Sequence, residues 1–213
     1  MKSLPLTSSF ARSTLSGKSI GKLKPIISKK KLPKSERQTF KLAETSWLRG
    51  LISESRFRVL AIDPGLSGAV VLIGEGDLQV RRDFKKDEDI SQAVRELAPG
   101  ALVCCIEHVH SKLGDGIKSA FSFGKFTGIA KGALHAFFKD PGCVLEPSPQ
   151  KWQFFIRKEL RVLPMSGPDK VEFNSLDLCR QLLPDRGQLF KRKLDHNTAD
   201  AVLIGAYCLA LLA

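Results

Sequence analysis

The sequence predicts an α/β protein in which helices flank a mixed β-sheet. Three observations lead to this class. Apolar β-branched runs alternate with amphipathic segments along the chain. The stretch RVLAIDPGLSGAVVLI at residues 58–73 is typical of strand–turn–strand. The run ALVCCI at residues 101–106 is continuously apolar, as in a strand that is covered on both faces.

The other elements follow in chain order. Regular structure begins weakly at residues 42–52 and firmly at Arg58. Beyond residue 73, the patterns predict a strand at 78–84, a helix at 89–97, a helix at 117–138, a short strand at 143–146, and helices at 149–160, 170–183 and 198–212. The 117–138 helix has glycines every four residues, at Gly124, Gly128 and Gly132. Because glycine weakens a helix, we expect a close backbone approach to another element there.

The positive charge of the chain is concentrated at its start. The 213 residues carry a net charge of +12, and residues 1–35 hold eight Lys, one Arg and no acid, which leaves only +3 for the rest. An acid-free segment rich in Ser and Thr resembles an organellar transit peptide. The alternative is a disordered basic arm that adds non-specific affinity for nucleic acid. We favour the transit peptide and expect residues 1–50 to be leader and linker and residues 51–213 to form the folded domain.

Composition excludes several classes of protein. With 43% hydrophobic residues the chain can bury a core, so it is not wholly disordered. No apolar run reaches the roughly 18 residues that a membrane span needs, and we expect no membrane partner. The five cysteines show no CxxC spacing, which indicates buried thiols rather than disulfides or a zinc site.

Four acids lie at the ends of apolar elements. Asp63 closes the first strand, Glu107 closes the run ALVCCI, and Asp195 and Asp200 bracket the start of the last helix. Carboxylates that converge raise one another's pKa unless a cation binds between them. Hard oxygen ligands with few histidines suit Mg²⁺ or Mn²⁺. The pattern therefore favours two-metal hydrolysis of a phosphodiester, with two ions in each active site.

Each acid also has a structural interpretation. Asp63 can be a turn residue before Pro-Gly, Asp195 an N-cap, and Glu107 a solvated strand end. Asp200 is the hardest to explain in this way, because its neighbours are apolar. Singly, the structural interpretation is favoured for each acid. In this order and on these elements, the four together favour a site.

Five segments give the sequence a specific resemblance. They are VLAIDPGLSGAVVLI, CCIEHV, SFGKFTGIAKGAL, EPSPQKWQ and DHNTADAVLIGAY. In this order they resemble the RuvC-like Holliday junction resolvases of the RNase H-like superfamily, and more closely the phage and plant organellar branch, the monokaryotic chloroplast type. The resemblance covers residues 57–213. It implies an RNase H-like fold with a mixed five-stranded sheet flanked by helices.

The same resemblance implies a function. It predicts a homodimer that resolves four-way DNA junctions by paired symmetric nicks with Mg²⁺ or Mn²⁺, and no small-molecule cofactor. It also favours an organellar location, the chloroplast in preference to a mitochondrion or a nucleoid. Two alternatives stay open: a YqgF-like RNA-processing nuclease of the same superfamily, and a junction-binding protein without catalysis. An actin-like or sugar-kinase ATPase needs two such halves, and the chain is long enough for one.

The resemblance carries over to single residues. Asp63, Glu107 and Asp200 match the metal ligands of the family. For the fourth ligand, the spacing in the bacterial enzymes selects Asn197 and the organellar spacing selects Asp195. We favour Asp195, with His196 or Asn197 orienting it or a metal-bound water. Lys170 begins a predicted helix where family members often carry a lysine near the scissile phosphate. It can equally be an ordinary exposed lysine.

Basic and apolar residues near these acids are candidates for DNA contacts. Lys191, Arg192 and Lys193 closely precede Asp195 and can grip phosphates, although a solvated charge run has the same composition. The loop after Glu107 is where the family often inserts side chains at the junction centre. Its candidates are Lys112, Leu113, Lys118, Phe121, Phe123 and Lys125. Phe121 and Phe123 can stack on bases or belong to the core.

Overall fold

The structure is a computed structural model, and it describes residues 42–65, 67–108, 116–160 and 172–213. The elements in these ranges, in chain order, are α1 (Leu42–Glu54), β1 (Arg58–Asp63), β2 (Ala69–Gly74), β3 (Asp77–Arg82), α2 (Asp87–Leu97), β4 (Val103–Ile106), α3 (Ile117–Phe137), β5 (Val144–Leu145), α4 (Pro149–Glu159), α5 (Ser175–Leu182) and α6 (His196–Leu212). Four short 3₁₀ segments, η1 (Ala98–Gly100), η2 (Pro141–Cys143), η3 (Pro184–Phe190) and η4 (Lys193–Asp195), connect them.

The strands form one mixed sheet of five strands in the order β3-β2-β1-β4-β5. Strands β1, β2 and β3 form an antiparallel meander, whereas β4 pairs parallel to β1 and β5 pairs parallel to β4. Helices lie on both sides of this sheet. The predicted fold class, a mixed five-stranded sheet flanked by helices, is confirmed.

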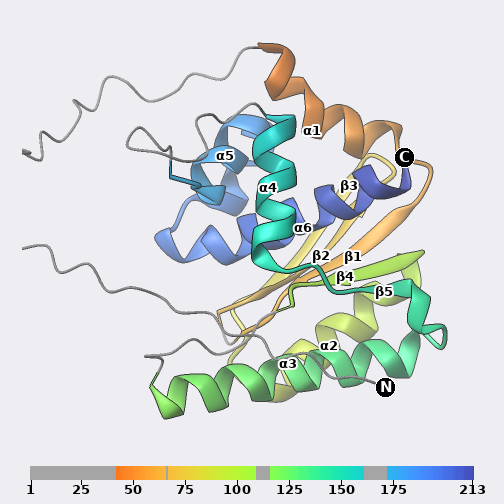
Figure 1. The fold of residues 1–213 in the computed structure, drawn as a ribbon, viewed down its shortest axis with the longest axis vertical. Coiled ribbons are helices and arrows are strands. Elements are labelled where there is room, and N and C mark those ends of the chain that lie inside the picture. Colours follow the sequence, from red (N-terminus) through yellow and green to blue (C-terminus); the bar gives the residue numbers. More distant parts are fainter. Residues whose placement is uncertain (1–41, 66, 109–115, 161–171) are drawn as a thin grey trace, which may run out of the picture. The chain divides into compact units, whose positions relative to one another are not determined.

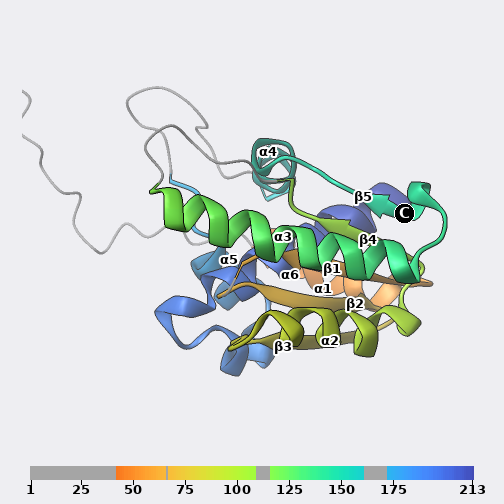
Figure 2. The ribbon, with the colours of Figure 1, turned by 90° about the horizontal axis from the view of Figure 1, so that it is seen from below.

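The sheet separates two hydrophobic clusters. Helices α2 and α3 cover one face, and α1, α4, α5 and α6 cover the other (Figures 1 and 2). Alternate residues of β1 therefore enter different clusters: Leu60 and Ile62 face α2 and α3, whereas Val59 and Ala61 face α6. All four side chains are fully buried. Because β1 is covered on both faces, every residue between its ends needs an apolar side chain, which explains its continuous apolar sequence.

The turn after β1 is tight. Asp63 is the last residue of the strand, and the backbone N–H of Gly68 donates to the carbonyl of Gly65 at 3.1 Å. A Cβ at Gly68 would lie 2.1 Å from the Asp63 carbonyl oxygen, so only glycine allows the chain to fold back here. The turn holds the Asp63 end of β1 against the start of β2.

Helix α1 matches the regular structure expected at residues 42–52, and its Leu48 and Ile52 are buried in the α6-side cluster. The structure differs from the sequence prediction in two places. Helix α5 begins at Ser175, since Asn174 caps it by accepting from the backbone N–H of Asp177. Nothing lies within 4 Å of a Cβ added at Gly124, Gly128 or Gly132 among the described residues, so none of these residues makes the expected close approach.

Two further predictions can be compared with the structure. The five cysteines are free thiols, and four of them are buried, as predicted; Cys143 is half-buried. Within the described ranges, no helix is both long and apolar enough to cross a membrane.

Candidate active site

Two carboxylates lie side by side at one edge of the sheet. Asp63 ends β1, and Glu107 follows directly after β4, which is the parallel neighbour of β1. The backbone N–H of Glu107 donates to the carbonyl of Ile62 at 3.1 Å, so the pairing continues to the ends of both strands. Because the carboxyl ends of parallel strands meet at the same edge, the two acids share a location.

A third carboxylate comes from the helix that crosses these strands. Helix α6 is apolar around nearly its whole circumference and packs on β1 and β2, and Asp200 lies in its second turn. Burial raises the pKa of Asp200, while a hydrogen bond from the Ser175 hydroxyl and the charge of His196 act in the opposite direction. A carboxylate on the buried face of such a helix needs a partner, and Ser175 supplies one.

The electrostatics of Asp63 link the three acids. Its pKa lies well above the ordinary value of 3.8, first because it is buried and then because of the negative charges of Asp200 and Glu107. Among the described residues, every cause that acts on Asp63 raises its pKa. The structure thus brings the charges of two further predicted acids, Glu107 and Asp200, close enough to raise the pKa of Asp63.

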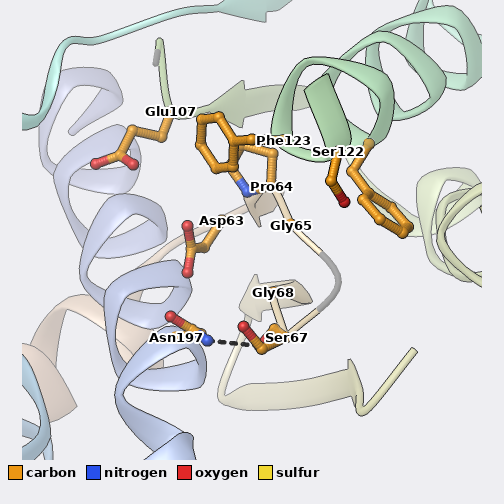
Figure 3. Close-up of a pocket in the computed structure, with 10 residues that line it drawn as sticks. Asp63, Pro64, Gly65, Ser67, Gly68, Glu107, Ser122, Phe123 and Asn197 are labelled. Carbon is orange, nitrogen blue, oxygen red and sulfur yellow. Dashed lines mark hydrogen bonds between the residues drawn. The ribbon is translucent and has the colours of Figure 1, made fainter. Parts of the chain in front are cut away.

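Two of these acids, Asp63 and Glu107, border a pocket of about 300 Å³. Asp63 and Glu107 line it from the sheet edge, Asn197 from α6, and Ser122 and Phe123 from α3. Figure 3 shows the Asp63 and Glu107 carboxylates turned toward α6, with the Phe123 ring beside Pro64 on the opposite side. The pocket therefore has an acidic wall and an aromatic wall.

Neighbouring side chains hold this wall in place. The indole N–H of Trp152, on α4, donates to Glu107 Oε1 at 2.8 Å. The Asn197 amide donates to the Ser67 carbonyl at 2.7 Å and so ties the start of α6 to the β1–β2 turn (Figure 3). Both Trp152 and Ser175 escaped the sequence prediction. Trp152 was interpretable only as a packing residue, and a serine beside an Asn cap carries no signal of its own.

Asp195, the predicted fourth ligand, is paired with two arginines. Its carboxylate is fully buried and ion-paired with Arg82 at 2.9 Å and Arg192 at 2.8 Å, and it also accepts from the Arg192 backbone N–H at 2.7 Å. Burial alone would raise its pKa, but these hydrogen bonds and charges hold it below the ordinary value. Among the described residues, those that line the pocket include Asn197 and not Asp195. Asp195 stands at the N-cap position of α6, but its carboxylate bonds to Arg192 before the helix and not to the first turn of α6.

The predicted DNA-contacting residues are spread over two regions. Lys118, Phe121 and Lys125 are exposed on α3, and the Phe121 ring is 74% exposed, whereas Phe123 is half-buried at the pocket. Lys191, Arg192 and Lys193 are exposed beside η4, and His196 contacts the Lys193 carbonyl through Nδ1. Arg192 is committed to Asp83 and Asp195. Lys112, Leu113 and Lys170 lie outside the described residues.

The fit of a divalent cation can be judged from the donors. Within the described ranges, no group of three or more His, Cys, Asp or Glu side chains is close enough to hold a metal ion together. The donor set nevertheless has the right chemistry, because Asp63, Glu107 and Asp200 supply hard carboxylate oxygens. Their mutual repulsion at Asp63 is the condition that a bound cation relieves.

Comparison with solved structures finds proteins of similar fold. RuvC from Thermus thermophilus, in complex with its Holliday junction substrate, matches over 73% of this chain and 96% of that chain, with 13% identity and a TM-score of 0.44. A second structure of Thermus thermophilus RuvC gives 15% identity over the same shares, with a TM-score of 0.43. The yeast mitochondrial Holliday junction resolvase Ydc2 matches over 76% of this chain and 82% of that chain, with 12% identity and a TM-score of 0.45.

Two of these three structures are of RuvC, and the third is of a mitochondrial Holliday junction resolvase. Comparisons with protein-family models and with curated proteins gave no match.

Proposed function

We propose that this protein is a structure-selective endonuclease that resolves four-way DNA junctions by hydrolysing phosphodiester bonds. One observation carries the proposal: Asp63 and Glu107, at the ends of two parallel strands, line one open pocket, and the charge of Asp200 on α6 reaches Asp63 and raises its pKa. Clustered carboxylates repel a phosphate, so a protein that only bound DNA would gain nothing from them. With divalent cations between them, the same carboxylates become a site for phosphate chemistry.

In this proposal, Asp63, Glu107 and Asp200 hold Mg²⁺ or Mn²⁺, two ions in each site. When bound, the ions would supply a hydroxide nucleophile and stabilise the charge on the leaving oxygen. The protein's own groups orient the donors: Trp152 holds Glu107, Ser175 holds Asp200, and Asn197 ties α6 to the turn beside Asp63. Asn197 takes the fourth position at the pocket in place of Asp195. Lys170 stays a proposed contact to the scissile phosphate.

The partner in this proposal is branched DNA, and the active species is a homodimer, because paired nicks need two sites. The proposed phosphate contacts are exposed Lys118 and Lys125 on α3, and exposed Lys191 and Lys193 beside η4. Phe121 is exposed enough to stack on a base, whereas Phe123 forms the pocket wall. We propose an organellar location from the basic leader, with the chloroplast preferred.

The decisive experiment uses the purified full chain and synthetic four-way junctions. The parent protein is expected to cut them with Mg²⁺ or Mn²⁺ and to leave them intact in chelator. Asp63→Asn is expected to abolish cutting, because it removes a ligand, and to spare junction binding without metal. A parent protein that leaves junctions uncut under both metals overturns the proposal.

A second substrate separates the alternatives. Structured RNA is offered to the same preparations under the same conditions. Preferential cleavage of RNA identifies a YqgF-like activity instead. Tight junction binding by parent and Asp63→Asn alike, with no cleavage of either substrate, identifies a binding protein without catalysis.

A further inference from the structure

We propose that Trp152 is a positioning residue for Glu107, an inference that rests on the proposed function. Trp152 is on α4, and its side chain is almost completely buried, with 1% exposure. Its only polar atom, the indole Nε1–H, donates to Glu107 Oε1 at 2.8 Å. An indole N–H can only donate, and a carboxylate oxygen is an acceptor. The two groups therefore match in chemistry as well as in distance.

The backbone of Glu107 alone does not fix its carboxylate. Main-chain hydrogen bonds anchor Glu107 and the next residue, His108. The Glu107 N–H donates to the Ile62 carbonyl, and the His108 N–H donates to the Pro147 carbonyl. A glutamate side chain still has three rotatable bonds beyond this anchor, and each loses freedom when the carboxylate is held. The hydrogen bond to a rigid, buried indole selects one arrangement before a cation arrives. Such preorganisation improves the affinity of a metal site without adding a ligand.

The indole also connects Glu107 to the support of Asp200. The Trp152 ring packs edge-on against Phe173, with centroids 5.5 Å apart and an interplanar angle of 74°. Phe173 immediately precedes Asn174, the cap of α5, and Ser175, whose hydroxyl bonds to Asp200. The Arg157 guanidinium lies over the same Phe173 ring, 5.3 Å from its centroid. One packed unit of α4 and the start of α5 thus contacts two of the three carboxylates.

The second tryptophan of the chain gives a matched control. The sequence holds only two, and Trp47 lies on α1, where it packs against the same cluster on the α6 side of the sheet. Trp152→Phe and Trp47→Phe each replace an indole by a phenyl ring and so remove its N–H. If the loss of any indole from this cluster were enough to weaken cation binding, both variants would weaken it. If Trp152 positions Glu107, only Trp152→Phe weakens binding.

The experiment titrates Mn²⁺ into the full-length parent and both variants by calorimetry, and measures junction binding in chelator. Loss of a group that orients a metal ligand typically lowers affinity by about 10- to 100-fold. We expect an approximately 10-fold or greater loss for Trp152→Phe, little change for Trp47→Phe, and metal-free junction binding as in the parent. Equal Mn²⁺ affinity in the two variants overturns the positioning role. A parent that binds Mn²⁺ but cuts no junction overturns the proposed function. In that case the Mn²⁺ affinities of the two variants still decide whether Trp152 positions Glu107.

A second measurement needs no change at Trp152. In Trp47→Phe, Trp152 is the sole source of indole fluorescence, and Mg²⁺ binding at Glu107 is expected to shift its emission. Adding Glu107→Gln, which keeps an acceptor oxygen but weakens the ligand, is expected to remove the shift. Emission that stays constant while calorimetry records saturating Mg²⁺ contradicts the positioning role.

Discussion

The attachment of α6 to the sheet can be tested at one glycine. Gly205 is buried, and a Cβ added there would lie 2.6 Å from Ile73 Cγ2 and 3.2 Å from Ala61 Cβ. Ile73 is fully buried and β-branched, so its side chain cannot easily rotate away. Ala61 is also fully buried, and its side chain is a single methyl group that cannot move independently of the backbone. Gly205→Ala therefore forces the helix and the sheet apart. Carbon atoms pack best at about 3.5–4.0 Å, so the required movement is roughly 1 Å.

The change in stability follows from two opposing effects. Overpacking of a close-packed core costs about 1–3 kcal/mol. Replacing glycine by alanine inside a helix returns about 1 kcal/mol. Because both neighbours of the new Cβ are fully buried, we expect the upper part of the first range and a net loss of about 1–2 kcal/mol. For a domain of this size, each kcal/mol lowers the Tm by about 2–4 °C, which gives a Tm roughly 2–8 °C lower.

Thermal unfolding followed by circular dichroism measures this shift, and Gly128→Ala is the control. Gly128 is also helical, but among the described residues nothing lies within 4 Å of its added Cβ, so alanine there should raise the Tm by about 1–4 °C. Helix α6 also carries Asp200, so Gly205→Ala is expected to reduce junction cleavage below the melting range. A Gly205→Ala protein as stable as the parent refutes the close contact between α6 and the sheet.

Two further predictions concern charged residues. Asp195→Asn should destabilise the fold by about 1–3 kcal/mol at pH 7, a value discounted because Arg82 and Arg192 are partly exposed. Since the pKa of Asp195 is lowered in the folded state, its contribution is present above the unfolded pKa and lost as pH falls through the folded pKa, so thermal unfolding of parent and variant should converge in acid. Lys193→Ala should weaken junction binding and reduce its salt-dependence slope by about one, measured by titration at several salt concentrations. Lys139→Ala, exposed beyond the far end of α3, is the control, and an equal effect there would contradict a local phosphate contact.

The sequence predicted the sheet because its signals are local. Alternating turns and apolar runs define β1, β2 and β4, and strands at the centre of a covered sheet must be apolar throughout. Asp63 and Glu107 were predictable for the same reason, since each ends such a run. Helix boundaries set by side-chain caps were less accessible. The start of α5 is set by the cap at Asn174, and it lies five residues after the predicted start at residue 170.

The features that the sequence did not predict depend on contacts between elements that are distant in the chain. The glycines of α3 predict a close neighbour, yet the face that carries them meets nothing among the described residues. The bond from Trp152 to Glu107 joins positions 45 residues apart, and no periodicity links them. Such pairs become visible only when the fold has placed α4 beside the end of β4.

The role of an acid near a helix start depends on its counter-charge, which spacing along the sequence does not reveal. Asp195 and Asp200 belong to the same short segment, and the sequence allows either to be a ligand. Arg82, from the end of β3, and Arg192 neutralise Asp195, so its charge is already used to fasten the start of α6. At Asp63, by contrast, the charges that act within the described residues come from other acids. The arginine pair at Asp195 therefore helps to keep the start of α6, with Asn197, at the pocket, whereas the charges of Glu107 and Asp200 act on Asp63.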